Sequence, residues 1–345
     1  MLLLIDASLY PFVGWRWPVE RVSDFLTAPW PRYLSRWEIP LNVAGYVPLG
    51  LLAITRFLGR WALVPAVLIV VSGGAVLSLM LETAQGFIPG RIASNLDWAS
   101  NIVGTALGAV LGLWLNHRWQ LIQRVRQARA RYFVQGYFAD LTTTVLLVWL
   151  FVQISPALSL LGTSEPRAFL ALENAVSYSP GRYLLMEALL TAMNALILLV
   201  LLRMLTRSPQ TSLVGFGSLL AMAVLCKTIG GLVFLRVPQA WLWLTPGALL
   251  GCVMGVAMFF VWERFVGVAG RALGWIAFLG AQLGSALLPQ NPYLEPMRQT
   301  VTYGHLSNFA GALWWTAQLW PWGALLCLLA LHASGRQPGW IHESR

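Results

Sequence analysis

The chain is dominated by long apolar blocks, and this feature constrains its fold more than any other. Nine blocks lie at 41–57, 61–82, 98–116, 137–161, 182–202, 212–235, 241–262, 272–288 and 306–331. A bilayer core of about 30 Å needs roughly 20 apolar residues per helix. Only helices and closed barrels satisfy every backbone polar group in lipid, and these blocks have the length of helices. The pattern predicts an all-α polytopic transmembrane helix bundle of nine or ten spans.

The tenth candidate span is the N-terminal stretch 2–13. It is short for a span and carries Asp6, and no small-residue cleavage site follows it, so a signal peptide is disfavoured. We expect a short first helix, truncated by a late start codon. The next segment, 14–40, is rich in tryptophan and proline, and we expect it to lie on the membrane surface, where tryptophan side chains prefer the headgroup level.

The composition excludes several other classes of protein. Only 10% of the residues are charged and 58% are hydrophobic, whereas an average soluble domain carries about 25% charge. A soluble enzyme, a disordered scaffold, a coiled coil and a secreted disulfide module are therefore all poor interpretations. The three cysteines lie inside apolar blocks without CxxC spacing, and the four histidines form no HExxH or other paired motif. We expect no metal site and no cofactor.

The net charge of +10 comes almost entirely from arginine. In a soluble protein such a charge would suggest nucleic acid, but here the arginines lie in loops between apolar blocks, which is a membrane topology signal. With ten spans and an inside N-terminus, the inner loops hold 13 arginines and the outer loops nine. The pattern predicts a multi-pass protein of the cell membrane with both termini in the cytoplasm and no nucleic-acid partner.

The arginine-rich stretch 117–136 also suggests a boundary between domains. We expect a membrane domain at 1–116, a basic cytoplasmic linker at 117–136, and a further multi-span region of unknown role at 137–345. The linker can be a basic helix on anionic lipid or an ordinary positively charged inner loop.

The most informative polar residues lie between 82 and 108. Glu82 closes an apolar helix with Gln85 on the same face, and Pro89-Gly90 then breaks the chain. Asp97, Asn101, Gly104 and Gly108 follow at spacings of four, three and four, which aligns them on one face of the next helix. We expect two antiparallel helices that bring Glu82 and Gln85 opposite Asp97 and Asn101, with Arg91 in the connecting loop.

Such a cluster has both functional and structural interpretations. Charges near a bilayer core are costly and usually pair or serve a function. The cluster could bind a polar headgroup, with Arg91 holding a phosphate, or provide a general acid. Structural interpretations remain open: Ser94-x-x-Asp97 fits a capping box, Glu82 and Arg91 can form an ion pair, and the glycines form a packing face.

At these residues the chain resembles the VanZ-like family of integral membrane proteins. The family pattern is Glu-x-x-Gln at the end of one helix, a loop with an arginine, and Asp-x-x-x-Asn-x-x-Gly-x-x-x-Gly in the next. The matching residues here are Glu82, Gln85, Arg91, Asp97, Asn101, Gly104 and Gly108, and the segments 9–12 and 42–50 are also similar. The resemblance covers about residues 1–116, whereas family members are commonly much shorter than this chain.

The resemblance implies a cell-envelope context and leaves the reaction open. The family is named for a protein linked to resistance to the glycopeptide antibiotic teicoplanin. Our leading hypothesis is a VanZ-like envelope protein whose partners are membrane lipids or a lipid-linked envelope precursor, recognised through Glu82, Gln85, Arg91, Asp97 and Asn101. The alternatives are a secondary transporter and a membrane enzyme acting on lipid headgroups, so enzymatic activity is undecided.

One further pair of polar residues favours the transporter alternative. Lys227 is the single lysine and lies within an apolar block, where it could pair with Glu187 and mark a solute or proton path. Snorkelling of the lysine to the interface is the other interpretation.

Overall fold

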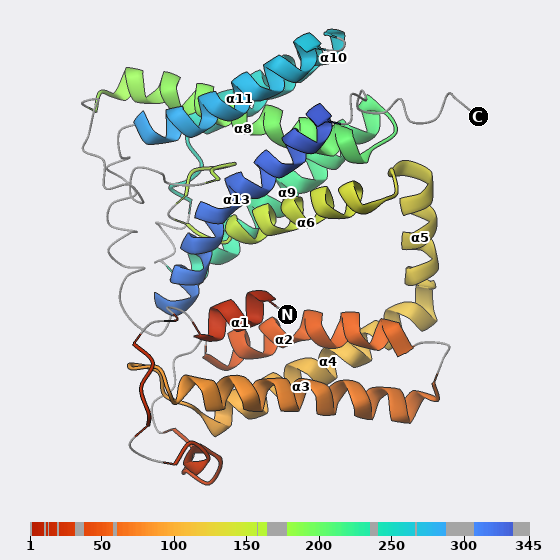
Figure 1. The fold of residues 1–345 in the computed structure, drawn as a ribbon, viewed down its shortest axis with the longest axis vertical. Helices are drawn as coiled ribbons and strands as arrows, with labels where there is room; N and C mark the ends of the chain where they lie inside the picture. Colours follow the sequence, from red (N-terminus) through yellow and green to blue (C-terminus); the bar gives the residue numbers. More distant parts are fainter. Residues whose placement is uncertain are drawn as a thin grey trace. The chain divides into compact units, whose positions relative to one another are not determined.

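The computed structural model describes residues 2–9, 12, 14–18, 21–31, 38–57, 61–156, 158–163, 178–234, 241–265, 268–287 and 307–333. These residues form helices joined by turns and loops, with an isolated β-bridge between Phe133 and Thr206 (Figure 1). The predicted all-α helix bundle is confirmed. The chain divides into two compact units, Met1–Gln127 and Ala128–Arg345, and each is described by itself. The predicted division at residues 116 and 136 stays a prediction.

The N-terminal unit contains the first four α-helices and a short 3-10 helix. They are α1 (Leu2–Leu9), η1 (Asp24–Leu26), α2 (Glu38–Phe57), α3 (Leu63–Gln85) and α4 (Asn95–Trp119). The helix expected at the N-terminus is α1, and its eight residues span about 12 Å, too little to cross a bilayer. The helix α5 (Leu121–Tyr132) follows Gln120, whose left-handed backbone (φ +47°) ends α4.

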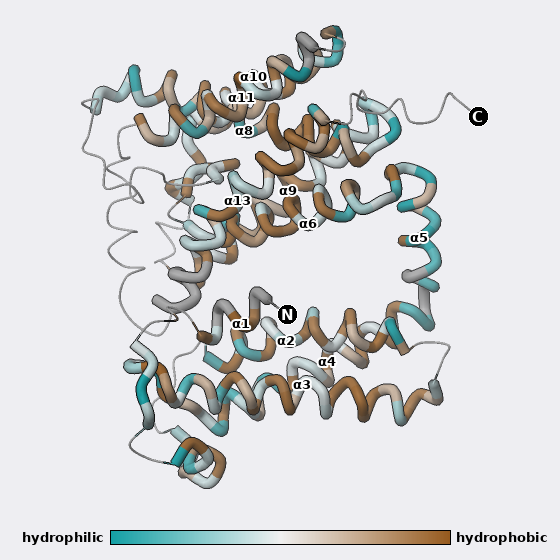
Figure 2. The backbone as a smooth tube through the Cα atoms, in the orientation of Figure 1, coloured by the Kyte–Doolittle hydropathy of each residue, from teal (hydrophilic) through white to brown (hydrophobic). Residues whose placement is uncertain are grey.

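Among its described residues, the C-terminal unit contains six helices longer than α5. They are α6 (Tyr137–Val152), α8 (Pro180–Leu205), α9 (Pro209–Phe234), α10 (Pro246–Arg264), α11 (Val268–Leu287) and α13 (Ser307–Ala333). Each of the nine apolar blocks predicted from the sequence therefore contains a helix. Hydrophobic residues run along these helices, whereas α5 is mostly hydrophilic (Figure 2).

Among the described residues, six helices are long and apolar enough to cross a membrane. They are α2, α3, α8, α9, α10 and, up to His117, α4. The chain is therefore a multi-pass membrane protein. The count of nine or ten spans and the orientation of the termini stay predictions. In the C-terminal unit α8 is the central helix, since 72% of its most apolar 18-residue stretch is buried, against 22% for the same length of α9.

Two predicted blocks differ from the observed helices because of proline. The block 137–161 was expected to be one span, but α6 ends at Val152. Pro156 has no N–H to donate to the Val152 carbonyl four residues earlier, so Ser155 N donates to it instead, at 3.0 Å. The block 241–262 begins with a turn, and α10 starts at Pro246, after its N-cap Thr245.

Close approach through small residues holds α2 and α4 together in the N-terminal unit. A Cβ atom added at Gly104 or Gly108 would collide with the carbonyl oxygen of Val43 or Val47. The contacting residue numbers rise together along the two helices, so α2 and α4 are parallel. The packing face predicted for the α4 glycines is therefore confirmed as their structural role.

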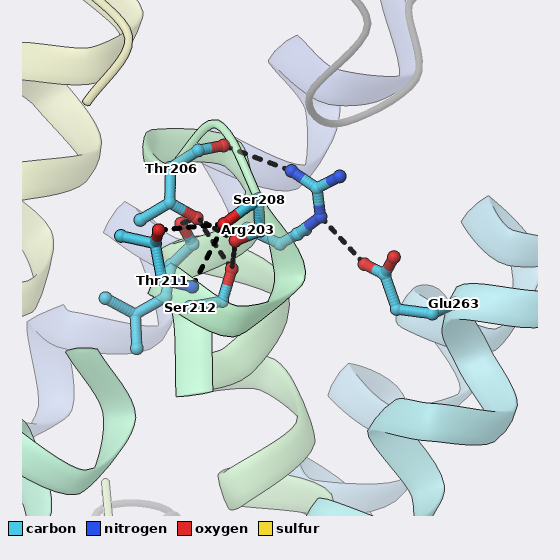
Figure 3. Close-up of polar contacts among 7 residues, drawn as sticks. Arg203, Thr206, Ser208, Thr211, Ser212 and Glu263 are labelled. Atoms are coloured by element: carbon cyan, nitrogen blue, oxygen red, sulfur yellow. Dashed lines mark hydrogen bonds and ion pairs between the residues drawn. The ribbon is translucent and has the colours of Figure 1, made fainter. Parts of the chain in front are cut away.

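The same arrangement recurs between α8 and α10 in the C-terminal unit. A Cβ atom added at Gly247, Gly251 or Gly255 would lie no more than 2.5 Å from the nearest atom of α8, which is too close for any real contact. These contacts also rise together in number, so this pair is parallel as well. At the end of the pair, Arg203 Nε donates to Glu263 Oε1 at 2.8 Å (Figure 3).

The turn between α8 and α9 is held by a polar network (Figure 3). Arg203 Nη1 donates to the Thr206 carbonyl at 3.0 Å, and the Thr206 and Ser212 hydroxyls lie 2.6 Å apart. Ser208 Oγ accepts the Thr211 amide at 3.2 Å, at the start of α9. The buried arginine thus satisfies one carbonyl that the end of α8 leaves without a helical partner.

We expect Gly108→Ala to destabilise the N-terminal unit by about 1–3 kcal/mol, because the new methyl group must displace the Val47 carbonyl. Thermal unfolding of the purified protein in detergent measures the effect. Gly73→Ala on α3 is the matched control, since a Cβ atom there meets no atom within 4 Å. Equal stability of the two variants would contradict the packing described.

The ion pair between Arg203 and Glu263 gives a second prediction. Replacing either side chain alone leaves a partly buried partner, so Arg203→Met and Glu263→Gln should each destabilise the protein. Because the residues interact directly, the double variant should be more stable than the sum of the single effects predicts, by about 1 kcal/mol. A double-mutant cycle of unfolding free energies tests this, and additive effects would count against the pair.

Candidate functional site

The candidate site is built where α3 ends and α4 begins. The chain leaves α3 at Gln85, four residues before Pro89, and turns through Gly90, whose φ of +81° suits glycine. Contacts then run in opposite order along the two helices. Gly74 lies against Thr105 while Ser78 contacts Asn101, so α3 and α4 are antiparallel as predicted (Figure 1).

Glu82 joins the two helices directly. It is only 3% exposed, and its Oε2 accepts the backbone N–H of Ser94 at 3.0 Å. Ser94 is the N-cap of α4, and its Oγ accepts the amides of Leu96 and Asp97. In a capping box the N-cap amide is bound by the acid three residues later. Here Glu82 of the neighbouring helix accepts that amide.

Asp97 contacts the third helix of the unit. Asn42 Nδ2 of α2 donates to Asp97 Oδ1 at 2.6 Å. Sequence reasoning did not name Asn42 as a site residue, although it opens the segment 42–50 that contributes to the VanZ-like resemblance. Its distance of 55 positions from Asp97 gives no periodic signal, so the contact emerges only from the parallel packing of α2 on α4.

Asn101 continues the polar face one turn further into the bundle. It is 5% exposed, and its Nδ2 donates to Ser78 Oγ of α3 at 2.9 Å. The Asn101 carboxamide oxygen has no hydrogen-bond partner in the described part of the chain. The hydroxyl of Tyr46, a buried residue of α2, lies close to the same polar face. Glu82 and Ser78 are the polar neighbours of Tyr46. The Asn101 oxygen is therefore a further hydrogen-bond acceptor beside the predicted residues.

Arg91 lies in the loop between the two helices and is partly buried. Burial lowers the pKa of its guanidinium below the ordinary value, while the negative charges of Glu82 and Asp97 act to raise it. All three charges are therefore within electrostatic range of one another. Gln85, the last residue of α3, is buried at 7% exposure. The five predicted site residues therefore lie on the last turn of α3, on the loop that follows it and on the first turns of α4.

The segment after α1 packs on this helix junction. Arg16 N donates to the Phe87 carbonyl at 2.9 Å, and the rings of Trp17 and Phe87 meet edge to face at 5.5 Å. Asn95 Nδ2 donates to the Ala28 carbonyl at 2.6 Å. Trp17 itself is 86% exposed, which fits the expected position of this segment at the membrane surface.

The structure does not bring Glu187 and Lys227 together. Glu187 lies at the start of α8, where Thr245 and Tyr183 are its hydrogen-bonding neighbours and Gly247 packs against it. Lys227 Nζ instead donates to the carbonyls of Ser155 and Leu158. Both side chains are buried, but Glu187 contacts hydroxyl groups and Lys227 contacts backbone carbonyls.

The chemistry available at the helix junction is that of polar recognition. Two carboxylates, a guanidinium and two carboxamides offer both hydrogen-bond donors and acceptors, with charges of both signs. In the residues that the structure describes, no three His, Cys, Asp or Glu side chains are grouped so that they could hold a metal ion. The cluster suits a ligand with a phosphate for Arg91 and with hydroxyl or ammonium groups for the acids.

Ser94 gives a test of the local geometry. Ser94→Ala removes the hydroxyl that caps α4 and should destabilise the protein by about 1 kcal/mol in thermal or denaturant unfolding. Ser94→Thr keeps a capping hydroxyl and is the matched control. A loss of stability that is the same for both variants would contradict the capping role.

Comparisons with known proteins identify a family for the N-terminal third of the chain. Residues 6–116 match the family model described as VanZ/LLP1. No curated protein and no solved structure matches the chain. The match covers α2, α3, most of α4 and every residue of the candidate site, and it leaves residues 117–345 outside. Residues 6–116 are therefore a VanZ-like domain, which makes up about a third of the chain.

Proposed function

We propose that the VanZ-like domain binds the polar headgroup of a membrane lipid or of a lipid-linked envelope component. The observation that carries the proposal is the convergence of Glu82, Arg91 and Asp97 at one end of two membrane-spanning helices. Charged groups there are costly unless they are paired or used. A headgroup that carries a phosphate and hydroxyl or ammonium groups complements all three side chains.

The position of the cluster supports a lipid rather than a soluble ligand. Arg91 lies in the short loop between the spans α3 and α4, so it lies near the level of the headgroups. The segment that packs on the helix junction carries the exposed residues Trp15, Trp17 and Trp30, and tryptophan prefers the level of the lipid headgroups. In the orientation expected from the arginine distribution, this end faces outward, towards the cell envelope.

A secondary transporter is the second candidate, and buried polar residues of α8 favour it. Glu187, Thr191 and Asn194 share one side of this helix and are each at most 3% exposed. Proton- or ion-dependent uptake in proteoliposomes would support transport. An enzyme acting on headgroups is the third candidate and requires turnover of extracted envelope lipids.

Lipid retention tests the leading proposal. The full chain, purified in mild detergent and exposed to a bacterial lipid extract, should retain phosphate-containing lipids detectable by native mass spectrometry. Arg91→Met should weaken retention at least tenfold, because a charged hydrogen bond contributes about 1.5–3 kcal/mol. Glu82→Gln and Asp97→Asn should change which headgroups are retained. Competition by inorganic phosphate would indicate a site for free phosphate rather than lipid.

The controls separate recognition from folding. Asp140→Asn removes a carboxylate of the exposed Arg129–Asp140 pair and should leave lipid retention unchanged. Thermal unfolding of every variant checks that the fold is intact. If well-folded Arg91→Met protein retains the same lipids as the wild type, the proposal is wrong.

The link to glycopeptide resistance extends the same proposal. If the bound molecule is an envelope precursor, a host expressing the chain should tolerate a higher concentration of teicoplanin, and Arg91→Met should abolish this gain. Unchanged susceptibility together with normal lipid retention would limit the proposal to lipid binding.

A further inference from the structure

The segment after α6 is a broken helix end that is buried inside the C-terminal unit. Residues 153–156 and 158–163 are not helical, yet Gln153 and Leu161 are fully buried and Thr163 is 3% exposed. Gln153 Nε2 donates to the Gly162 carbonyl at 2.9 Å and closes the segment into a loop. Leu161 has φ +58°, which is strained for leucine and persists only where its surroundings impose it.

The helix α9 approaches this loop very closely. A Cβ atom added at Gly230 would collide with the Ile154 carbonyl oxygen, so only glycine permits the contact. One turn earlier on α9, Lys227 Nζ donates to the carbonyls of Ser155, at 3.1 Å, and Leu158, at 2.9 Å. Glycine and lysine together therefore direct the Lys227 amine onto two loop carbonyls beyond the end of α6.

The surroundings of Lys227 are made of dipoles rather than charges. Its side chain is fully buried, and in the described part of the chain it forms no ion pair with a carboxylate. The Gln153 Oε1 atom, on the same loop, is buried without a hydrogen-bond partner and adds another oxygen acceptor. A cation in a medium of low dielectric needs such oxygens to replace its hydration.

We propose that the loop formed by residues 153–156 and 158–163 is a binding site for a monovalent cation of the ammonium class, and that the Lys227 side chain is its resident occupant. Carbonyl oxygens of broken helices bind free cations inside other membrane proteins. Here the cation is tethered to α9, so the site is filled without an external ion. Removal of the tether leaves the oxygen ligands in place and converts the loop into a receptor for a free cation.

Chemical rescue tests this proposal on the full chain in detergent. Lys227→Ala removes the ammonium and leaves space for a ligand, so its melting temperature should fall. Ethylammonium chloride in the range of 100 mM should raise it again by about 3 °C through binding to the folded state. Potassium and sodium chloride at equal ionic strength identify which monovalent cation the oxygens accept, and tetramethylammonium, which has no N–H donor, should not rescue.

Two further variants keep the test decisive. Lys227→Met fills the same volume without a charge, and its melting temperature should not respond to ethylammonium. If Lys227→Ala cannot be purified, Lys227→Ser replaces it in the same assay, and hydrogen exchange of residues 153–163 in Lys227→Met should be faster than in the wild type. An absence of cation-dependent stabilisation in both small variants, or the same response in Lys227→Met, would overturn the proposal.

Discussion

A polar side chain on a membrane-spanning helix that faces the protein interior must form its hydrogen bonds within the protein, because lipid tails offer neither donors nor acceptors. Three sites in this chain meet that constraint in a similar way, by a buried side chain that binds backbone groups at or beyond the end of a helix. Glu82 accepts the first amide of α4, Arg203 binds a carbonyl at the end of α8, and Lys227 binds carbonyls beyond α6. Each site lies where a helix ends, since helix ends leave backbone groups unbonded.

Close helix packing makes these contacts possible. In both units a row of glycines lets two parallel helices approach until backbone meets backbone, at α2 and α4 and at α8 and α10. Asn42 reaches Asp97, and Arg203 reaches Glu263, because these pairs lie on helices held at that short separation. A bulkier residue in either row would disrupt the polar contacts as well as the packing.

The sequence predicted the helices well because apolar blocks and prolines are local signals. It did not predict contacts that depend on which helices become neighbours, so the Asn42–Asp97 bond was missed, and the pairing suggested for Lys227 and Glu187 differs from the contacts that these side chains make. The end of α6 had a local signal in Pro156, four residues after Val152, just as Pro89 follows Gln85. Proline alone is not sufficient, since Pro48 lies inside α2 without ending it.

The charges of the VanZ-like domain exceed what its fold requires. A carboxamide oxygen at residue 82 could also accept the Ser94 amide, and an asparagine at 97 could still bond to Asn42. A glutamate and an aspartate held close together in a poorly hydrated place repel each other, and Arg91 offsets this only by being partly buried itself. A structural role alone would favour neutral side chains at these positions. Under the proposed function, a charged or strongly polar ligand that completes this set of ionisable groups accounts for their presence.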